Sequence, residues 1–202
     1  MRLLELFSGT GSVRKAVGHK FDEIVSIDIL AKFNPTECID IMEWNYKKYP
    51  VGYFDCIWSS PPCTEYSIVL NGRPNRPRDI EVANSIVLRT IEIINYFQPD
   101  KWFIENPQTG LLKDQPFMFG IPFVDVDYCK FGYTYRKRTR IWTNVDFQDC
   151  LCNKDCGNII GKRHKNAIGN SSYEETWNRG NEQRINQRYS IPSRLIQALF
   201  EV

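Results

Sequence analysis

The stretch Ile57-Trp58-Ser59-Ser60-Pro61-Pro62-Cys63 decides how the rest of this chain of 202 residues is organised. The short apolar run that leads into it, residues 53–58, predicts a buried strand. A strand that ends in a Pro-Pro turn presents the next side chain, here the thiol of Cys63, at the carboxyl edge of a sheet. Because open α/β sheets bind their ligands at that edge, Cys63 is a candidate nucleophile.

Strands and helices alternate on both sides of this stretch. Further apolar runs predict strands over residues 2–7, 23–29, 37–41, 101–104, 123–128 and 135–143. Helical spacing of apolar residues and end signals predict helices over residues 12–17, over 79–97 and after Pro192. The alternation predicts an α/β fold, a doubly wound and mostly parallel sheet with helices on both faces.

The composition changes after residue 143. Apolar residues become sparse over residues 144–188, whereas Asn, Gly, Lys and Arg are dense. We interpret this segment as a small, loop-rich lobe. The predicted organisation is therefore a main domain over residues 1–143, the lobe over 144–188, and a C-terminal helix over 189–202 that returns to the main domain.

The overall composition is that of an ordinary globular protein, with 42% hydrophobic and 25% charged residues and a net charge of +2. No apolar run is long enough to cross a membrane, and the apolar start, residues 3–7, is too short for a signal peptide. We therefore expect an intracellular protein without a membrane partner, and a monomer. Seven cysteines, an odd number, argue against a disulfide framework.

A glycine-containing turn, Ser8-Gly9-Thr10-Gly11-Ser12, follows the first predicted strand. Glycines allow a tight turn close to a ligand, and the start of the next helix favours negative charge. Asp28, near the end of the second strand, could accept hydrogen bonds from ribose hydroxyls. The alternative for Asp28 is a carboxylate that caps the next turn. Together these features are typical of a nucleotide-like ligand site.

One acidic residue and two groups of arginines are further candidates for function. Glu105 ends a short apolar strand, where a carboxylate is costly to bury unless it is paired. Arg136, Arg138 and Arg140 alternate along the strand predicted over 135–143, so all three should project from one face. Such a face is usually solvated, but it also suits contacts with phosphates or bases. Three more arginines lie in the polar loop at residues 64–78: Arg73, Arg76 and Arg78.

Seven short motifs in order span nearly the whole chain: Phe7-Ser8-Gly9-Thr10-Gly11, Asp28, Asp40, Pro61-Pro62-Cys63, Glu105-Asn106-Pro107, Arg138-Thr139-Arg140 and Ile191-Pro192. In this combination the chain resembles the cytosine-C5 DNA methyltransferase family. The resemblance implies the class I, Rossmann-like methyltransferase fold, with S-adenosyl-L-methionine as the cofactor and DNA, duplex or single-stranded, as the partner. It also implies that residues 1–143 form the catalytic and cofactor-binding domain.

The resemblance also implies roles for individual residues. The implied cofactor-binding residues are Phe7, Ser8, Gly9, Thr10, Gly11, Asp28, Ile29, Asp40, Ile41, Ser60 and Pro61. The implied catalytic residues are Cys63, Glu105, Arg138 and Arg140. The implied nucleic-acid-binding residues are Ser67, Arg73, Arg76, Arg78 and Arg136.

The implied reaction explains why these residue types are needed. Carbon 5 of cytosine is a poor nucleophile, and attack of the Cys63 thiolate on carbon 6 turns the ring into an enamine that accepts a methyl group. Glu105 would bind the N3 and N4 edge of the ring, and Arg140 with Arg138 the O2 side. The target base must be flipped out or already single-stranded, with residues 64–78 closing over it.

The chain departs from the family in two places. Arg136 stands where the family usually has glutamine, and the segment between Thr143 and Tyr189 is much shorter than the usual target-recognition domain. We therefore expect a short or degenerate target, or a partner that supplies specificity. Gly169-Asn170-Ser171 is similar to the opening of the family's last motif, but Ile191-Pro192 is the better match to that motif.

Two alternative functions remain. One is C5 methylation of cytosine in tRNA, because a tRNA-acting branch shares these motifs. The other is a catalytically idle nucleic-acid-binding protein of the same fold. The thiol at Cys63 argues against an amino-directed DNA methyltransferase, since those enzymes have an aromatic residue at this position.

A cysteine-rich stretch in the lobe has spacing that permits a structural zinc site. The candidate ligands are Cys150, Cys152, Cys156 and His164. The alternative is a loop with free thiols. A small polar lobe with few core residues would gain stability from a bound metal.

Overall fold

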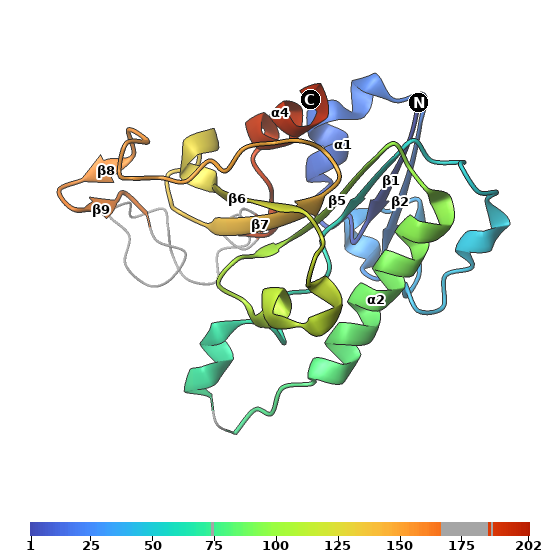
Figure 1. Ribbon diagram of the computed structural model, residues 1–202, viewed down its shortest axis with the longest axis horizontal. Coiled ribbons are helices and arrows are strands. Elements are labelled where there is room, and N and C mark those ends of the chain that lie inside the picture. Colours follow the sequence, from blue (N-terminus) through green and yellow to red (C-terminus); the bar gives the residue numbers. More distant parts are fainter. Residues whose placement is uncertain (74, 167–185, 187) are drawn as a thin grey trace.

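A seven-stranded sheet, in the order β3-β2-β1-β4-β5-β7-β6, forms the centre of the protein in a computed structural model that describes residues 1–73, 75–166, 186 and 188–202 (Figure 1). The strands are β1 (Arg2–Leu6), β2 (Glu23–Asp28), β3 (Glu37–Cys38), β4 (Cys56–Ser59), β5 (Lys101–Pro107), β6 (Phe123–Asp127) and β7 (Arg138–Thr143). The first five strands are parallel, and β7 runs antiparallel to β5 and β6. The predicted fold class, a doubly wound and mostly parallel sheet, is confirmed.

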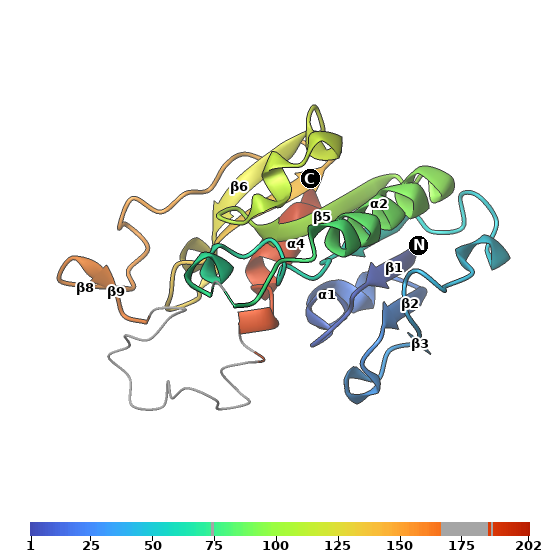
Figure 2. The same ribbon diagram turned by 90° about the horizontal axis from the view of Figure 1, so that it is seen from below.

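Helices cover both faces of this sheet (Figure 2). One face packs against α2 (Ile80–Phe97), and the other packs against α1 (Ser12–Val17) and α4 (Ser193–Glu201). Successive strand residues alternate between the two cores, as the pleat requires: Leu4 belongs to the α2 core and Leu3 to the α1–α4 core. Each strand of the centre is thus buried on both faces.

Helix α2 has the residue range, the N-terminal cap and the buried stripe that the sequence predicts. The Asp79 carboxylate caps its start by accepting a hydrogen bond from the Val82 amide at 3.1 Å. The buried stripe follows helical spacing through Ala83, Val87 and Ile94. The helix ends where Gln98 adopts a left-handed conformation, with φ of 50°, immediately before Pro99.

Two of the predicted strands, β3 and β4, are shorter than expected. Strand β3 ends at Cys38 rather than at residue 41, because Asp40 forms a turn whose side chain accepts the Met42 amide at 2.9 Å. Strand β4 begins at Cys56 rather than at residue 53, because the Tyr53 amide closes a turn onto the Pro50 carbonyl at 3.1 Å. Turn hydrogen bonds outcompete strand pairing at both places.

The boundaries also differ at β5 and β7. Strand β5 continues through Glu105 to Pro107, three residues past its predicted end. Strand β7 begins at Arg138 rather than at residue 135, so Arg136 precedes the strand and only Arg138 and Arg140 alternate within it. Glu105 is therefore a strand residue and not part of the following loop.

The described part of the lobe, residues 144–166, starts along the outer edge of β6. Cys150 exchanges two backbone hydrogen bonds with Asp125 and Asp127, at 3.0 and 2.9 Å. The chain then forms a small hairpin of β8 (Ile159–Ile160) and β9 (Arg163–His164), which projects from the body of the protein (Figure 1). The motif candidate Gly169-Asn170-Ser171 lies outside the described residues.

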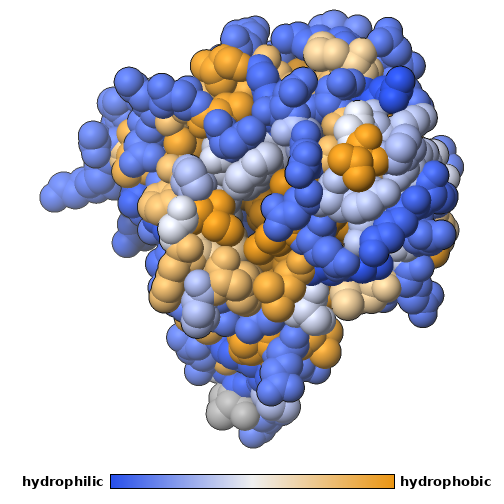
Figure 3. Space-filling view, turned by 45° about the vertical axis from the view of Figure 1, so that its right-hand side comes forward, coloured by the Kyte–Doolittle hydropathy of each residue, from blue (hydrophilic) through white to orange (hydrophobic). Residues whose placement is uncertain are grey.

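The surface is mixed in character. Figure 3 shows a face that is largely hydrophilic, with hydrophobic residues gathered between the charged groups. In the described part of the chain, no helix is long and apolar enough to cross a membrane.

Candidate active site

Cys63 lies at the carboxyl edge of the sheet, after the Pro-Pro turn that ends β4, and its side chain is half-buried. The turn is fixed to β5, because the Asn106 amide group donates a hydrogen bond to the Pro61 carbonyl at 3.0 Å. It is also fixed to β1, since the Ser60 amide donates to the Leu6 carbonyl at 3.3 Å. The thiol is thus held between the ends of the two strands that flank β4.

Glu105 projects from β5 beside this turn and is only 6% exposed. Its Oε1 atom accepts a hydrogen bond from the Tyr128 hydroxyl at 2.9 Å and lies 3.5 Å from the Lys137 ammonium. Burial and the neighbouring Glu105 charge raise the pKa of Tyr128 well above its ordinary value, so its hydroxyl stays protonated as a donor. A buried carboxylate is tolerated here because it has two partners.

The same lysine is the cation that acts most strongly on Cys63, and Arg188 makes a smaller contribution of the same sign. Burial raises the pKa of the Cys63 thiol, and the positive charge of Lys137 opposes this, while Glu105 adds to it. The Lys137 ammonium also lies 4.8 Å from the centre of the Tyr128 ring. Cys63, Glu105, Tyr128 and Lys137 therefore form one cluster, in which Lys137 favours the thiolate form.

Arg138 and Arg140 lie on the opposite face of the sheet from Glu105. In the β5–β7 pairing Glu105 is opposite Ile141, whereas Arg140 is opposite Asn106, and successive residues of a strand point to opposite faces. The structure therefore does not bring the two arginines to the Cys63 cluster.

Both guanidiniums are engaged by carboxylates of β6 instead. Arg138 forms two hydrogen bonds with Asp127, at 3.1 and 2.9 Å, and Arg140 forms two with Asp125, at 2.8 and 2.7 Å. Asp127 is fully buried and also accepts the Cys152 amide at 2.8 Å. In this structure the two pairs join β6 to β7.

The glycine-containing turn between β1 and α1 has three residues with positive φ: Phe7 at 56°, Gly9 at 45° and Gly11 at 67°. This conformation is strained for Phe7 and costs little for glycine. It directs the Gly9 amide toward Asp28, whose Oδ2 accepts it at 2.7 Å. A left-handed turn at the sheet edge is thus held against the end of β2.

Asp28 and its neighbours line this second part of the edge. The Oδ1 atom of Asp28 accepts the Leu30 amide at 2.8 Å, so the carboxylate caps both the glycine turn and its own loop. The next side chain, Ile29, is 62% exposed, which is unusual for isoleucine and leaves an apolar surface beside the carboxylate. In the turn after the neighbouring strand β3, Asp40 is half-buried and Ile41 is buried.

A buried acid beneath the glycine turn was not anticipated from the sequence. Glu5 of β1 is 2% exposed, and its Oε1 accepts the Val13 amide at the start of α1 at 3.2 Å. Burial raises the pKa of Glu5 to about 7. Only the apolar neighbours on either side of Glu5 in the sequence hinted that this residue would be inside.

The arginine-bearing loop at residues 64–78 contains a short 3₁₀ helix, Ile68–Gly72, capped by the Ser67 hydroxyl. Arg76 pairs with Glu65 at 2.8 Å, and Arg78 donates to the Glu65 carbonyl and to Asn71. Arg73, in the same loop, and Arg136, ahead of β7, are exposed. Two of the three loop arginines are therefore used within the loop itself.

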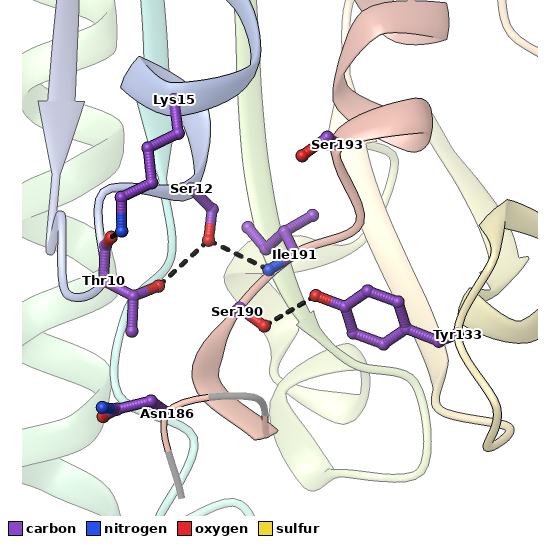
Figure 4. Close-up of a pocket in the computed structure, with 8 residues that line it drawn as sticks. All are labelled: Thr10, Ser12, Lys15, Tyr133, Asn186, Ser190, Ile191 and Ser193. Atoms are coloured by element: carbon purple, nitrogen blue, oxygen red, sulfur yellow. Dashed lines mark hydrogen bonds between the residues drawn. The ribbon is translucent and has the colours of Figure 1, made fainter. Parts of the chain in front are cut away.

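A pocket of about 280 Å³ opens beside the glycine turn (Figure 4). Its walls come from the turn, from α1, from Tyr133 and from the segment before α4. The Ser12 hydroxyl accepts the Ile191 amide at 3.1 Å, and the Tyr133 and Ser190 hydroxyls are 2.6 Å apart. The lining residues are Thr10, Ser12, Lys15, Tyr133, Asn186, Ser190, Ile191 and Ser193.

The cysteine cluster of the lobe differs from the predicted one in one member. Cys129, directly after β6, takes the place of Cys150, whose backbone is paired along the β6 edge. The pKa of Cys152 lies below its ordinary value. Burial alone would raise it, but hydrogen bonds to the sulfur from Cys129 and from the Lys154 amide have the larger effect and lower it. Spacing along the chain could not indicate Cys129, because it lies 23 residues from Cys152.

Comparison with known proteins gives a consistent result. The sequence model of the family described as "C-5 cytosine-specific DNA methylase" matches residues 1–116, more than half of the chain. The "Probable DNA (cytosine-5)-methyltransferase" of Frog virus 3 (isolate Goorha) is 32% identical over 219 aligned residues, which cover all of both chains.

Solved structures support the fold. The S. pombe Dnmt2 methyltransferase matches 73% of this chain with a TM-score of 0.51 and 15% identity, and a DNMT2 mutant from Spodoptera frugiperda matches 81% with 0.50 and 20%. This chain spans 52% and 57% of those two chains, about half of their length. The enzyme class predicted from the motifs, DNA (cytosine-5-)-methyltransferase, is confirmed by the first two matches, and the chain belongs to the C-5 cytosine-specific DNA methylase family.

Proposed function

We propose that this protein transfers a methyl group to carbon 5 of a cytosine in DNA through a covalent bond between Cys63 and carbon 6. The observation that carries the proposal is the cluster at the sheet edge. A half-buried thiol lies there in the field of Lys137 and next to the buried carboxylate Glu105. A thiol so placed can become a nucleophile once the base displaces water from the site.

Glu105 is suited to bind the N3 and N4 edge of the cytosine. Its Oε1 is held by Tyr128 and Lys137, which fixes the carboxyl group in one orientation before the base arrives. Charge that develops on the ring during attack would meet Lys137 at the same place. A proton acceptor then removes the proton from carbon 5, and elimination breaks the bond between carbon 6 and the Cys63 sulfur.

The roles predicted for Arg138 and Arg140 at O2 of the base stay a prediction. Their pairing with Asp127 and Asp125 supports a positioning role as well. The paired arginines hold β7 in register against β6, where the Tyr128 amide donates to the Lys137 carbonyl at 3.1 Å. Lys137 and Tyr128 both contact Glu105 of β5 from this position.

The edge between β1 and β2 fits S-adenosyl-L-methionine, which supplies the methyl group when bound. The Asp28 carboxylate can accept hydrogen bonds from the ribose hydroxyls, and the exposed Ile29 offers an apolar surface to the adenine. A Cβ at Gly9 would have little but the Phe7 carbonyl near it, 3.8 Å away, so the glycine leaves open space beside the turn. Ser60 and Pro61 connect this edge to Cys63.

DNA contacts are proposed for the loop at residues 64–78 and for Arg136. The base of the loop is anchored, since the Leu111 amide donates to the Tyr66 carbonyl at 2.9 Å. Beyond this anchor Arg73 is exposed, and the arginines that pair with Glu65 and Asn71 can exchange these partners for phosphates. The sequence between Thr143 and Tyr189 is short, which supports a short target or a specificity partner.

The proposal is tested by offering tritiated cofactor with duplex DNA, single-stranded DNA and tRNA. We expect label in a DNA substrate, and a stable adduct of Cys63 with an oligonucleotide that contains 5-fluorocytosine. Cys63→Ser should lose both, whereas Cys150→Ser, which alters another half-buried cysteine, should keep both. Label in tRNA alone would favour the RNA alternative, and the absence of an adduct would favour an idle binding protein.

A further inference from the structure

Four potential metal ligands converge where the lobe meets the sheet. The sulfur atoms of Cys129, Cys152 and Cys156 and a ring nitrogen of His164 all lie within 4.8 Å of one another. They come from three separate segments: the 3₁₀ turn after β6, the loop at residues 150–158, and strand β9. Side chains from three segments rarely gather so closely without a common partner.

One sulfur–nitrogen distance in this cluster matches tetrahedral zinc, and the other ligand atoms lie within 4.8 Å of one another. Bond lengths of about 2.3 Å to sulfur and 2.0–2.1 Å to nitrogen place two sulfurs about 3.8 Å apart, and a sulfur and a nitrogen about 3.6 Å apart. The Cys152 sulfur is 3.5 Å from His164 Nε2. Because three sulfurs and one nitrogen complete a tetrahedron, such a site has no open position and is structural.

The backbone around the ligands is already shaped. The Cys152 amide is fixed by the buried Asp127 at 2.8 Å, and the loop turns through left-handed residues at Lys154 and Gly157, with φ of 68° and 74°. His164 is paired with Ile159 across the β8–β9 hairpin. Little reorganisation is needed to bring the four side chains onto one ion.

The lobe also lacks another source of stability. Among residues 144–166 only Cys152 and Asn166 are buried, so this segment has no apolar core of its own. A segment of this size without a core is generally held by disulfides or a metal. The cysteines here are free thiols in the described part of the chain, which leaves a metal as the fitting crosslink.

We propose that Cys129, Cys152, Cys156 and His164 bind one structural Zn²⁺ that fastens the lobe to the end of β6. The site is linked to the Cys63 cluster, because Cys129 directly follows Tyr128, whose hydroxyl holds Glu105. Zinc would therefore fix the lobe and, through one peptide bond, the orientation of a proposed active-site residue. The proposal does not depend on the proposed methyl transfer.

The first test is the metal content of the full chain, purified under reducing conditions without chelator. We expect one zinc per chain in the wild-type protein and in Cys150→Ser, and a loss of at least half of the zinc in Cys129→Ser and in Cys152→Ser. Two results would overturn the proposal: wild-type protein with reduced thiols and no zinc, or loss of zinc from Cys150→Ser with retention in Cys129→Ser.

The second test needs no variant, so it does not depend on how the substituted proteins fold. Zinc is exchanged for Co²⁺ in the wild-type protein and the absorption spectrum is recorded. Intense tetrahedral d–d bands with thiolate charge-transfer bands are expected from three sulfurs and one nitrogen. The weak spectrum of octahedral cobalt, or the absence of charge-transfer bands, would contradict the proposed ligand set.

Discussion

Glu5 and Glu105 are two buried glutamates on strands of the same sheet, and the protein treats them in different ways. Glu105 has a lysine at 3.5 Å and a tyrosine hydroxyl at 2.9 Å. Glu5 has the Val13 amide and, among the described residues, no cation within ion-pair distance, and burial raises its pKa to about 7. A buried acid can thus be paired with a cation, as Glu105 is, or be left with a backbone amide, as Glu5 is, where burial raises its pKa.

This difference divides the sheet by task. On the side of β5, β7 and β6, carboxylates and cations are matched, and the proposed chemistry depends on charge. On the side of β1 and β2, acids are held mainly by backbone amides, and the proposed task is to bind a cofactor. Substitutions at Glu105, Glu5, Asp28 and Lys137 test this division.

Replacing Glu105 with Gln should lower kcat by about 10²–10³-fold, because an amide cannot share a proton with N3 as negative charge develops on the ring, whereas a carboxyl group can. Cofactor affinity should not change, since the cofactor is assigned to the β1–β2 side. Single-turnover methyl transfer and titration with S-adenosylhomocysteine separate the two effects. An equal loss of cofactor affinity would contradict the division.

The contribution of Glu5 to the stability of the wild-type protein should fall as the pH rises from about 4.5, its ordinary pKa, to about 7, its pKa in the folded protein. The sign follows from linkage: the raised pKa means that the folded state binds more protons than the unfolded state in this range. Glu5→Gln should therefore be more stable than wild type at pH 8 by about 3 kcal/mol, and equally stable at pH 4.5.

Urea denaturation at the two pH values measures this difference. The exposed acid Glu43 serves as the control, because Glu43→Gln should leave the pH dependence as it is in the wild type. If Glu5→Gln is the less stable protein at pH 8, then Glu5 is not an isolated acid.

Asp28→Asn should weaken cofactor binding by about 10–100-fold, since a charge-assisted hydrogen bond to a hydroxyl contributes about 1.5–3 kcal/mol. At saturating cofactor, kcat should be close to that of the wild type, because Asp28 is assigned no part in the chemistry. Calorimetric titration with S-adenosylhomocysteine gives the affinity. If the affinity for S-adenosylhomocysteine is unchanged, Asp28 only caps the neighbouring turns and does not bind the cofactor.

Lys137→Met should lower the rate at pH 7 by about tenfold, because the pKa of Cys63 rises further when its nearby cation is removed. The rate should recover at higher pH, where the thiol ionises without help. Lys137→Arg should behave like the wild type. A pH–rate profile with an unmoved basic limb in Lys137→Met would show that Lys137 does not act on the thiol.

Much of this fold was predictable because its signals are local. The apolar strand before Ser60-Pro61-Pro62, the glycine turn after β1 and the capped stripe of α2 each specify one element from a short stretch. The ends of strands were less predictable. Asp40 and Tyr53 each continue an apolar run that predicts a strand, but both form turn hydrogen bonds in the structure.

The composition of the site depended on facts that no single stretch contains. Lys137 lies directly before the Arg138-Thr139-Arg140 motif, and only the folded structure shows that Lys137 reaches Glu105 while Arg140 points to the other face. Cys129 likewise joins the lobe cysteines only through the packing of β6 against residues 150–152.

The contact between α1 and α4 has a consequence for synthesis of the protein. Helix α4 lies against α1 and covers Trp58 and Phe103 on that face of the sheet, and the Ile191 amide is bound to Ser12. A ribosome releases residues 193–201 about 180 residues after it has made the start of α1. The nascent chain can assemble its α2 face early, but its α1 face stays open to chaperones and to other chains until α4 has left the ribosome.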